Sequence, residues 1–220
     1  MKQLKVAVLG CGLIGVSWTA LFLAHGHDVA VWDPSPAARD GVEDGVALPM
    51  AQLVELGLGE GRSRGRLTLC AEPEEAVRGV DLVQENAPES VPLKRALYAR
   101  VEAAAPVGAL IASSTSSLVW SDLAEGMAHS GRFVTAHPFN PPHLMPLVEI
   151  YGRDPATVSR AEAFYHDLGR RTVRLRRDAV GHIANRLASA LWREAVNIVA
   201  EGIADVSEVD AALVHGPGLR

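Results

Sequence analysis

The chain has 220 residues, of which 48% are hydrophobic and 21% charged, and a formal net charge of −5. These values are typical of a globular protein with one complete domain and a smaller second one, and they exclude a disordered chain. The acidic balance gives no electrostatic reason to expect a nucleic-acid partner. Because no apolar run approaches the roughly 18 residues of a membrane span and no signal-peptide pattern is present, we expect a cytoplasmic protein with no membrane partner.

Apolar runs and helical periodicity alternate along most of the chain. The predicted strands are residues 4–9, 28–32, 67–69, 81–84, 109–112, 133–136, 147–151 and 172–175. The predicted helices are residues 13–24, 36–56, 93–104, 155–168, 183–204 and 206–213. The helix over 36–56 is expected to stop around Gly57, Gly59 and Gly61. Strands separated by helices predict the α/β class, with a doubly wound, mostly parallel sheet that binds ligands at the carboxyl ends of its strands.

The first predicted strand runs into Gly10, Gly12 and Gly15 in the pattern Gly-x-Gly-x-x-Gly. The first glycine permits a tight turn, the second lets the backbone approach a pyrophosphate, and the third lets the helix pack on the strand. A plain strand-to-helix turn is the alternative. Asp33, at the end of the second strand, is placed to accept hydrogen bonds from the adenosine ribose and to repel a 2′-phosphate, and we interpret Arg39 as a surface residue. The sequence therefore predicts a Rossmann dinucleotide site that prefers NAD to NADP.

The pattern changes near Asp178, where the strands end and long helices begin. We predict an NAD-binding Rossmann domain over residues 1–178 and the start of a helical substrate and dimerisation domain over 179–220. The long helix carries an apolar stripe made of Leu187, Leu191, Ala195, Ile198 and Ile203. Because little chain follows to cover this stripe, we expect a homodimer through the last forty residues, or a fragment of a longer chain that forms one.

His137 and Glu149 are a candidate proton acceptor and its orienting carboxylate. A neutral imidazole can take the proton of a substrate hydroxyl, and the carboxylate fixes the tautomer and stabilises the imidazolium that forms. This chemistry requires no metal. A structural histidine at a strand end is the alternative for His137. His25, His27 and His143 have no comparable partner carboxylate or motif, and we interpret them as surface or loop residues.

Three further patterns are ambiguous from the residues alone. Residues 113–117 are five consecutive hydroxyl residues after a buried strand, which fits either a site at the sheet edge or ordinary cap and turn chemistry. Lys94 is the only lysine beyond residue 5, so its ammonium is a candidate functional group, with chance as the alternative. We interpret the arginines within 170–177 as the solvated face of a strand, and Cys11 and Cys70 as reduced core residues.

The glycine motif and four other segments together resemble the L-3-hydroxyacyl-CoA dehydrogenase family over essentially the whole chain. The four segments are 83–89 (Val-Gln-Glu-Asn-Ala-Pro-Glu), 114–117 (Ser-Thr-Ser-Ser), 137–141 (His-Pro-Phe-Asn-Pro) and 184–187 (Ala-Asn-Arg-Leu). Residues 140–149 and 191–195 look most like the branch that acts on free 3-hydroxy acids, which contains L-carnitine dehydrogenase and the lambda-crystallin-like L-gulonate 3-dehydrogenase. The resemblance implies that His137 is the acid/base and Glu149 its partner, with Ser116 and Asn185 binding the reacting oxygen.

The resemblance also implies a cofactor site and an activity. Glu89 and Lys94 are expected near the nicotinamide ribose. The other implied NAD contacts are Gly10, Gly12, Leu13, Ile14, Gly15, Asp33, Ser116 and Asn140. The implied reaction is hydride transfer between NAD and the C3 hydroxyl or keto group of a small 3-hydroxy acid. Two alternatives stay open. One is a 3-hydroxyacyl-CoA dehydrogenase, although the helix over 36–56 has a single cation, Arg39; the other is an NAD-binding structural protein or inactive truncated homologue.

Overall fold

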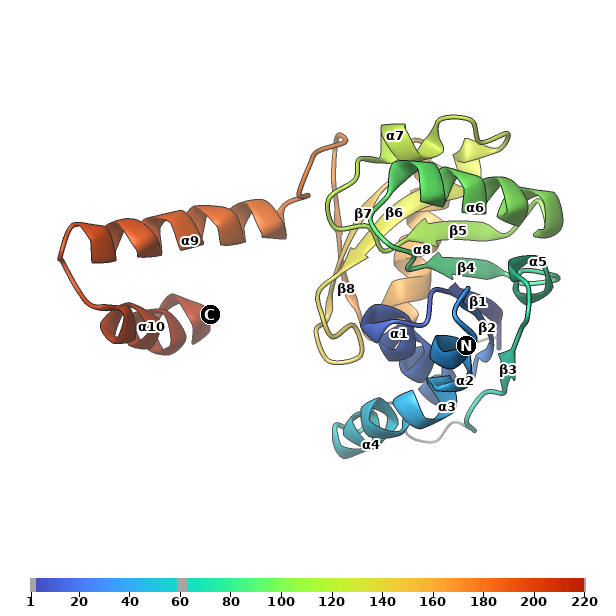
Figure 1. Ribbon diagram of the computed structural model, residues 1–220, viewed down its shortest axis with the longest axis horizontal. Helices are drawn as coiled ribbons and strands as arrows, with labels where there is room; N and C mark the ends of the chain where they lie inside the picture. The colour runs from blue at the N-terminus through green and yellow to red at the C-terminus, as the bar shows by residue number, and fades with distance from the viewer. Residues whose placement is uncertain (1–2, 59–62, 220) are drawn as a thin grey trace. The chain divides into compact units, whose positions relative to one another are not determined.

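The computed structural model describes residues 3–58 and 63–219, and the chain divides into two compact units, Met1–Val180 and Gly181–Arg220. The first unit is built on an eight-stranded sheet with the order β3-β2-β1-β4-β5-β6-β7-β8 (Figure 1). Its strands are β1 (Lys5–Leu9), β2 (Asp28–Trp32), β3 (Leu67–Leu69), β4 (Leu82–Glu85), β5 (Leu110–Ser113), β6 (Phe133–Pro138), β7 (Leu147–Tyr151) and β8 (Arg171–Arg174). All neighbouring strands are parallel except β6 and β7. The order reverses between β1 and β4, which confirms the predicted doubly wound, mostly parallel sheet.

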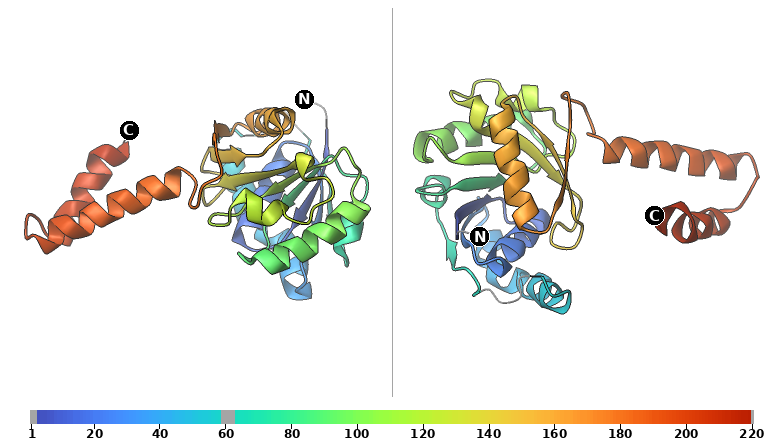
Figure 2. Two further views of the ribbon diagram at one scale, coloured as in Figure 1. Left: turned by 90° about the horizontal axis from the view of Figure 1, so that it is seen from above. Right: turned by 180° about the vertical axis from the view of Figure 1, so that it is seen from behind.

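Helices cover both faces of this sheet. The helices of the first unit are α1 (Leu13–Ala24), α2 (Pro36–Asp40), α3 (Val42–Gly45), α4 (Ala47–Glu55), α5 (Pro73–Ala76), α6 (Val91–Ala104), α7 (Trp120–Ala124) and α8 (Pro155–Asp167), with a 3-10 turn η1 (Ser130–Arg132). Helices α6 and α7 lie on one face, and α8 lies on the other (Figures 1 and 2). Because helices cover both faces of the sheet, the connecting loops lie at the ends of the strands.

The single helix predicted over 36–56 is wrong, because the chain forms α2, α3 and α4 there. Gly41 lies between α2 and α3, and Gly45 is the last residue of α3; glycine is the weakest helix former after proline. A Cβ on Gly45 would lie 3.2 Å from a methyl of Val16, so the chain passes close to α1 at this point. Gly57 has φ of +67° just after α4, as expected for a helix stop, and Gly59 and Gly61 lie outside the described residues.

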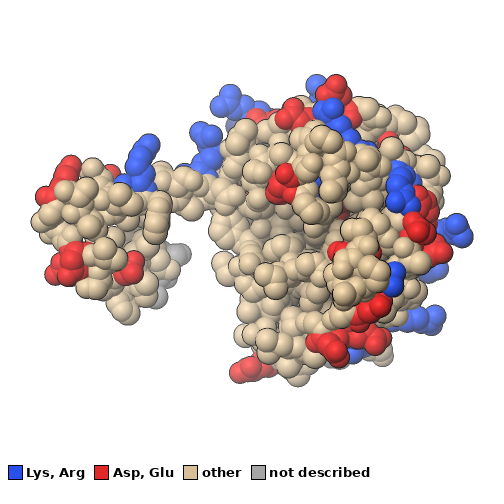
Figure 3. Space-filling view, in the orientation of Figure 1, with Lys and Arg blue, Asp and Glu red and all other residues tan. Residues whose placement is uncertain are grey.

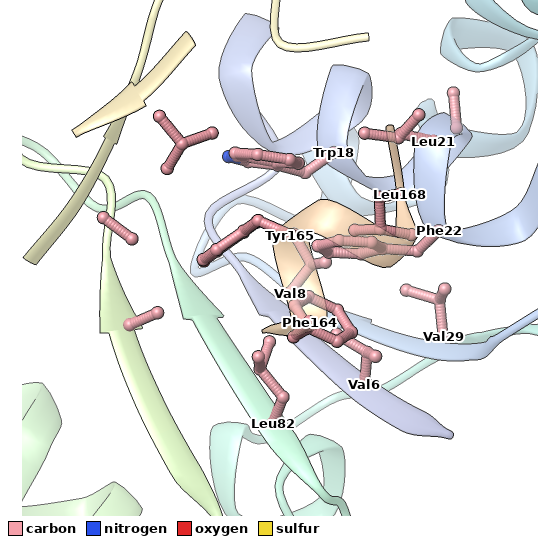
Figure 4. Close-up of a cluster of buried hydrophobic side chains, with 14 of the residues drawn as sticks. Val6, Val8, Trp18, Leu21, Phe22, Val29, Leu82, Phe164, Tyr165 and Leu168 are labelled. Atoms are coloured by element: carbon pink, nitrogen blue, oxygen red, sulfur yellow. The ribbon is translucent and has the colours of Figure 1, made fainter. Parts of the chain in front are cut away.

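Alternate residues of the central strands supply two apolar cores. Val6 and Val8 of β1 belong to the core beneath α1 and α8, whereas Ala7 and Leu9 belong to the core beneath α6 and α7. In the first core the rings of Trp18 and Phe22 stack 5.4 Å apart, with Tyr165 and Phe164 of α8 beside them (Figure 4). Burial on both faces explains why these strands read as continuous apolar runs.

The second unit consists of α9 (Ala184–Ala200), α10 (Val206–His215) and a 3-10 turn η2 (Pro217–Leu219). A capping box starts α10, because Asp205 accepts the N–H of Glu208 and the Glu208 side chain accepts the N–H of Asp205. Four residues of the predicted apolar stripe lie on α9, where Leu187 and Leu191 are 66% and 47% exposed, and the fifth, Ile203, follows the end of the helix. Among the described residues, α9 has no buried member.

Charged side chains of both signs are interspersed on the visible face of the first unit (Figure 3). The arginine run does not form one solvated strand face. Arg171 and Arg174 are exposed as expected, but Arg170 is 4% exposed and donates to the carbonyls of Leu168 and Pro142. Within residues 3–58 and 63–219, no helix is long and apolar enough to cross a membrane.

Candidate active site

The glycine turn joins β1 to α1 at the carboxyl edge of the sheet. Gly10 has φ of +95°, and a Cβ there would lie 2.8 Å from the backbone of Asn86, so a side chain is excluded twice over. A Cβ on Gly15 would lie 1.9 Å from the carbonyl oxygen of Gly10, so the helix can pack on the turn only with glycine at this position. By contrast, a Cβ on Gly12 would meet nothing within 4 Å. The second glycine therefore faces open space, as backbone that approaches a pyrophosphate must.

A cavity of about 530 Å³ opens beside this turn. Its lining residues are Gly10, Gly12, Trp32, Asp33, Pro34, Asn86, Ala87, Pro88, Leu93, Ala96, Leu97 and Arg100. Asp33 follows β2 and accepts the N–H of Cys11 at 2.7 Å and that of Ser35 at 2.8 Å. A carboxylate has about four lone-pair sites, so this one keeps capacity for further donors such as ribose hydroxyls. Arg39 is half-buried and paired with Asp40 at 2.9 Å, rather than fully on the surface.

His137 and Glu149 meet across the antiparallel pair of β6 and β7, where they are register partners. The Nδ1 atom of His137 lies 2.9 Å from Oε2 of Glu149, and the two side chains are 6% and 1% exposed. In the neutral ring Nδ1–H donates to the carboxylate, which leaves the basic lone pair on Nε2. Because β6 runs parallel to β5 and β4, His137 lies at the same sheet edge as the glycine turn.

The hydroxyl-rich loop after β5 is organised by Glu89. The Glu89 carboxylate accepts the N–H of Ser116 at 2.9 Å and the hydroxyls of Thr115 at 2.7 Å and Ser117 at 3.1 Å. Burial acts to raise the pKa of this carboxyl, but the three loop donors and the nearby ammonium of Lys94 bring the pKa below its ordinary value. The structure thus brings Glu89 and Ser116 together and keeps Glu89 ionised.

Lys94 is 1% exposed and lies in a cluster of buried polar groups. Its ammonium donates to Glu85 Oε1 at 2.5 Å and to the carbonyl of Ala87 at 2.8 Å. Sequence reasoning selected Lys94 and the hydroxyl run that contains Ser113, but it gave no role to Glu85 or Tyr98. Tyr98 and Ser113 donate to the other oxygen of Glu85. A glutamate that ends a buried strand is the signal that could have revealed this cluster.

The loop between β6 and β7 contains His143, which the sequence analysis interpreted as a surface or loop residue. His143 is 4% exposed rather than on the surface, with Nδ1 2.7 Å from the hydroxyl of Ser17 and Nε2 2.8 Å from Oε1 of Gln52. Burial, followed by the charge of Arg170, lowers the pKa of His143 below its ordinary value.

His25 and His27 are also buried, at 8% and 1% exposed. They are buried because the turn that ends α1 packs back onto the sheet. The N–H of His27 donates to the carbonyl of Phe22, and the N–H of Leu4 donates to Nδ1 of His27.

Two further predicted site residues, Asn140 and Asn185, lie on other segments of the chain. Asn140 is exposed and precedes a cis peptide bond to Pro141. Asn185 lies in the first turn of α9, in the second unit. Of the remaining predicted cofactor residues, Leu13 is 82% exposed at the start of α1, and Ile14 packs against the apolar core.

Comparison with known proteins agrees with this arrangement. The model of the 3-hydroxyacyl-CoA dehydrogenase NAD binding domain matches residues 5–179, and that of the C-terminal domain matches residues 181–220. The chain belongs to the 3-hydroxyacyl-CoA dehydrogenase family. It is 48% identical over 98% of its length to an L-carnitine dehydrogenase of Streptomyces griseus subsp. griseus, and 46% identical over 97% to one of Pseudomonas syringae pv. syringae. The relatives confirm the family and its carnitine dehydrogenase branch, and the match to the NAD binding domain confirms NAD as the cofactor of residues 5–179.

Solved structures give the same fold. An NAD+-dependent dismutase, FHMPC 5-dehydrogenase, has a TM-score of 0.91 and 29% identity, over 99% of this chain and 72% of that one. FadB2 of M. tuberculosis has a TM-score of 0.85 and 26% identity, over 99% of this chain and 79% of that one. The chain spans about two thirds of the curated relatives named above, 65% and 68% of their lengths.

Proposed function

We propose that this chain carries the cofactor site and acid/base pair of an NAD-dependent dehydrogenase that acts on the C3 hydroxyl or keto group of a small 3-hydroxy acid of the carnitine type. The observation that supports this most is the pairing of His137 with Glu149 at the sheet edge that also carries the glycine turn. The curated relatives, which are L-carnitine dehydrogenases, support the free acid over a CoA thioester.

The proton is handled by His137. In oxidation, Nε2 takes the proton of the substrate's C3 hydroxyl, and Glu149 stabilises the imidazolium through Nδ1–H. Bound NAD supplies the hydride acceptor, at its nicotinamide C4. In reduction the imidazolium returns the proton to the carbonyl oxygen. The oxidation therefore requires a neutral imidazole, and the reduction a protonated one.

The residues of the cavity fit a dinucleotide. Gly12 offers open backbone at the start of α1, where the helix N-terminus favours a pyrophosphate. Asp33 is the ribose acceptor in this proposal, and its charge disfavours a 2′-phosphate. We assign Glu89, Lys94 and Asn140 to the nicotinamide half. Ser116 and Asn185 are the proposed ligands of the reacting oxygen.

Hydride transfer by this chain is the test. NADH absorbance is followed with L-carnitine, a panel of other free 3-hydroxy acids, and one 3-hydroxyacyl-CoA. The expected result is reduction of NAD by a free acid, and a loss of roughly two to four orders of magnitude in turnover in His137→Ala with NADH binding retained. Turnover with the thioester alone would instead identify a 3-hydroxyacyl-CoA dehydrogenase. NADH binding without any turnover would favour a structural or inactive protein.

We also propose that the exposed apolar stripe, which runs along α9 and ends at Ile203 just after the helix, forms a homodimer interface. Leu187, Leu191 and Ile203 are 66%, 47% and 68% exposed, and exposed apolar surface of this kind commonly marks an interface. Sedimentation at micromolar concentration should give a dimer, and Leu191→Glu should shift it toward monomer. A monomer with full activity would contradict this proposal. The cytoplasmic location expected from the sequence stays a prediction.

A further inference from the structure

Glu85 lies at the centre of the nucleotide edge of the sheet. It ends β4, and its register partners are Leu9, which precedes the glycine turn, and Ser113, which precedes the hydroxyl-rich loop. The order of the sheet reverses between β1 and β4, and ligands of doubly wound sheets bind outside the strands at that point. The Glu85 side chain is nevertheless fully buried. Because a buried carboxylate is costly unless it is paired and hydrogen-bonded, its partners indicate what it does.

The Oε1 atom of Glu85 holds the segment after β4. It accepts the Lys94 ammonium at 2.5 Å and the N–H of Ala87 at 2.6 Å. The same ammonium donates to the carbonyl of Ala87 at 2.8 Å. The Glu85 carboxylate therefore binds the N–H of Ala87, and the Lys94 ammonium binds its carbonyl, so both backbone polar groups of Ala87 are held. Ala87 and Pro88 are wall residues of the 530 Å³ cavity.

The Oε2 atom of Glu85 holds the other side. It accepts the hydroxyl of Tyr98 and, at 2.7 Å, that of Ser113. Burial, and then the charge of Glu85, raises the pKa of Tyr98 well above its ordinary value, so the phenol remains a donor. The four donors satisfy both oxygens, and only those on Oε1 reach the wall of the cavity.

We propose that Glu85 and Lys94 are positioning residues: a buried ion pair that fixes the Ala87–Pro88 wall against which the adenosine half of the nucleotide binds. This rests on the proposed NAD site. It adds a second role to the assignment of Lys94 to the nicotinamide half, because it also links Lys94 to the adenosine half of the cofactor.

ADP separates these two roles, because it contains the adenosine and the diphosphate but neither the nicotinamide nor its ribose. If Lys94 only contacts the nicotinamide ribose, its removal weakens NADH binding and leaves ADP binding unchanged. If Lys94 fixes the Ala87–Pro88 wall, its removal weakens the binding of both. Affinity for ADP also requires no turnover, so this readout is independent of the substrate.

The variants are Glu85→Gln and Lys94→Met in the full chain, with Glu102→Gln as the matched control. Glu102 lies on α6, as Lys94 does, and its carboxylate accepts two backbone N–H groups, of Ala128 and His129, at 2.8 and 2.9 Å. It also faces a cation, Arg132, at 4.0 Å. Glu102 is not part of the nucleotide cavity, so the control reproduces a structural carboxylate without the proposed positioning role.

ADP and NADH affinities are measured by calorimetry on variants whose near-ultraviolet circular dichroism matches the wild type. We expect both dissociation constants to rise at least about tenfold in Glu85→Gln and Lys94→Met, and to stay within about twofold in Glu102→Gln. Folded variants with wild-type ADP affinity overturn the proposal, whether or not NADH binding falls. If Glu85→Gln does not fold, Lys94→Met decides alone. A wild type that binds neither nucleotide refutes the proposed function itself, which is a different result.

Discussion

Replacing Ser17 with alanine should destabilise the first unit far more than the loss of one surface hydroxyl would. The Ser17 hydroxyl, in the middle of α1, accepts the backbone N–H of His143 at 2.9 Å and lies 2.7 Å from Nδ1 of the same residue. The Nε2 atom of His143 lies 2.8 Å from Oε1 of Gln52, which can only accept, so the neutral ring carries its proton on Nε2. Nδ1 is then the acceptor, and the Ser17 hydroxyl donates to it.

The magnitude follows from the groups that are left without partners. Ser17→Ala leaves a backbone N–H and a ring nitrogen unsatisfied on a residue that is 4% exposed. Each such group costs about 1–3 kcal/mol, so the free energy of unfolding should fall by about 2–6 kcal/mol. With a urea m-value of about 2 kcal/mol/M, the unfolding midpoint should fall by about 1 M or more.

Thr19→Val is the matched control on the same helix. Thr19 is as buried as Ser17, but its hydroxyl donates to the carbonyl of Gly15, an acceptor that also serves the helix. Its removal leaves no group unsatisfied and should cost less than about 1 kcal/mol. Urea unfolding followed by tryptophan fluorescence compares the two variants. A Ser17→Ala loss no larger than that of Thr19→Val would refute the bonding that we derive for His143.

Four shorter predictions concern the cofactor, the acid/base pair and two titrating groups. Wild type should bind NADH far better than NADPH, and Asp33→Asn should reduce the difference between the two affinities in a fluorescence titration. Equal affinities in wild type would contradict the assignment of Asp33 to the adenosine ribose. Glu149→Gln should retain NADH binding and lose part of the turnover, and unchanged kinetics would separate Glu149 from the chemistry. Burial, then the charge of Asp33, raises the pKa of the Cys11 thiol to about 12, so iodoacetamide should label it very slowly at pH 8, and rapid labelling would contradict its burial. The pKa of His143 lies below its unfolded value of about 6.5, so just below pH 6.5 the unfolded chain binds more protons than the folded one. The urea midpoint of unfolding should therefore fall on acidification from pH 7 to 5.5, and it should fall less in His143→Gln.

The residues that follow strands were predictable, because the topology brings them to one edge. Gly10 after β1, Asp33 after β2, the loop containing Ser116 after β5, and His137 at the end of β6 all meet where parallel strands end. Local patterns are enough to identify each of them. The division of 36–56 into three helices was not predictable in this way, because it involves the close approach of Gly45 to Val16, which is a tertiary contact.

The residues that hold this edge in place were not predictable. Glu85 is surrounded by donors up to 28 positions away, and the bond between Ser17 and His143 spans 126 positions. No periodicity or motif records such pairs. Whether a histidine is a surface residue or a buried one depends on its partner, and sequence spacing does not supply the partner. This is why the burial of His143 was not predicted, whereas His137, whose carboxylate lies on the next strand, was paired with Glu149 from the sequence.

The difference between residues that take part in the chemistry and residues that hold the sheet edge in place predicts how variants will behave. His137 and Glu149 act on the proton, so their loss should lower turnover and leave nucleotide affinity almost intact. Glu85 and Lys94 act on the position of backbone that lines the cavity, so their loss should lower affinity for any adenosine-containing ligand. Ser17 supports the loop between β6 and β7 through His143, so its loss should appear first in stability. A variant of a supporting residue that lowered turnover alone would mean that the edge is held by other contacts and that this residue takes part in the chemistry.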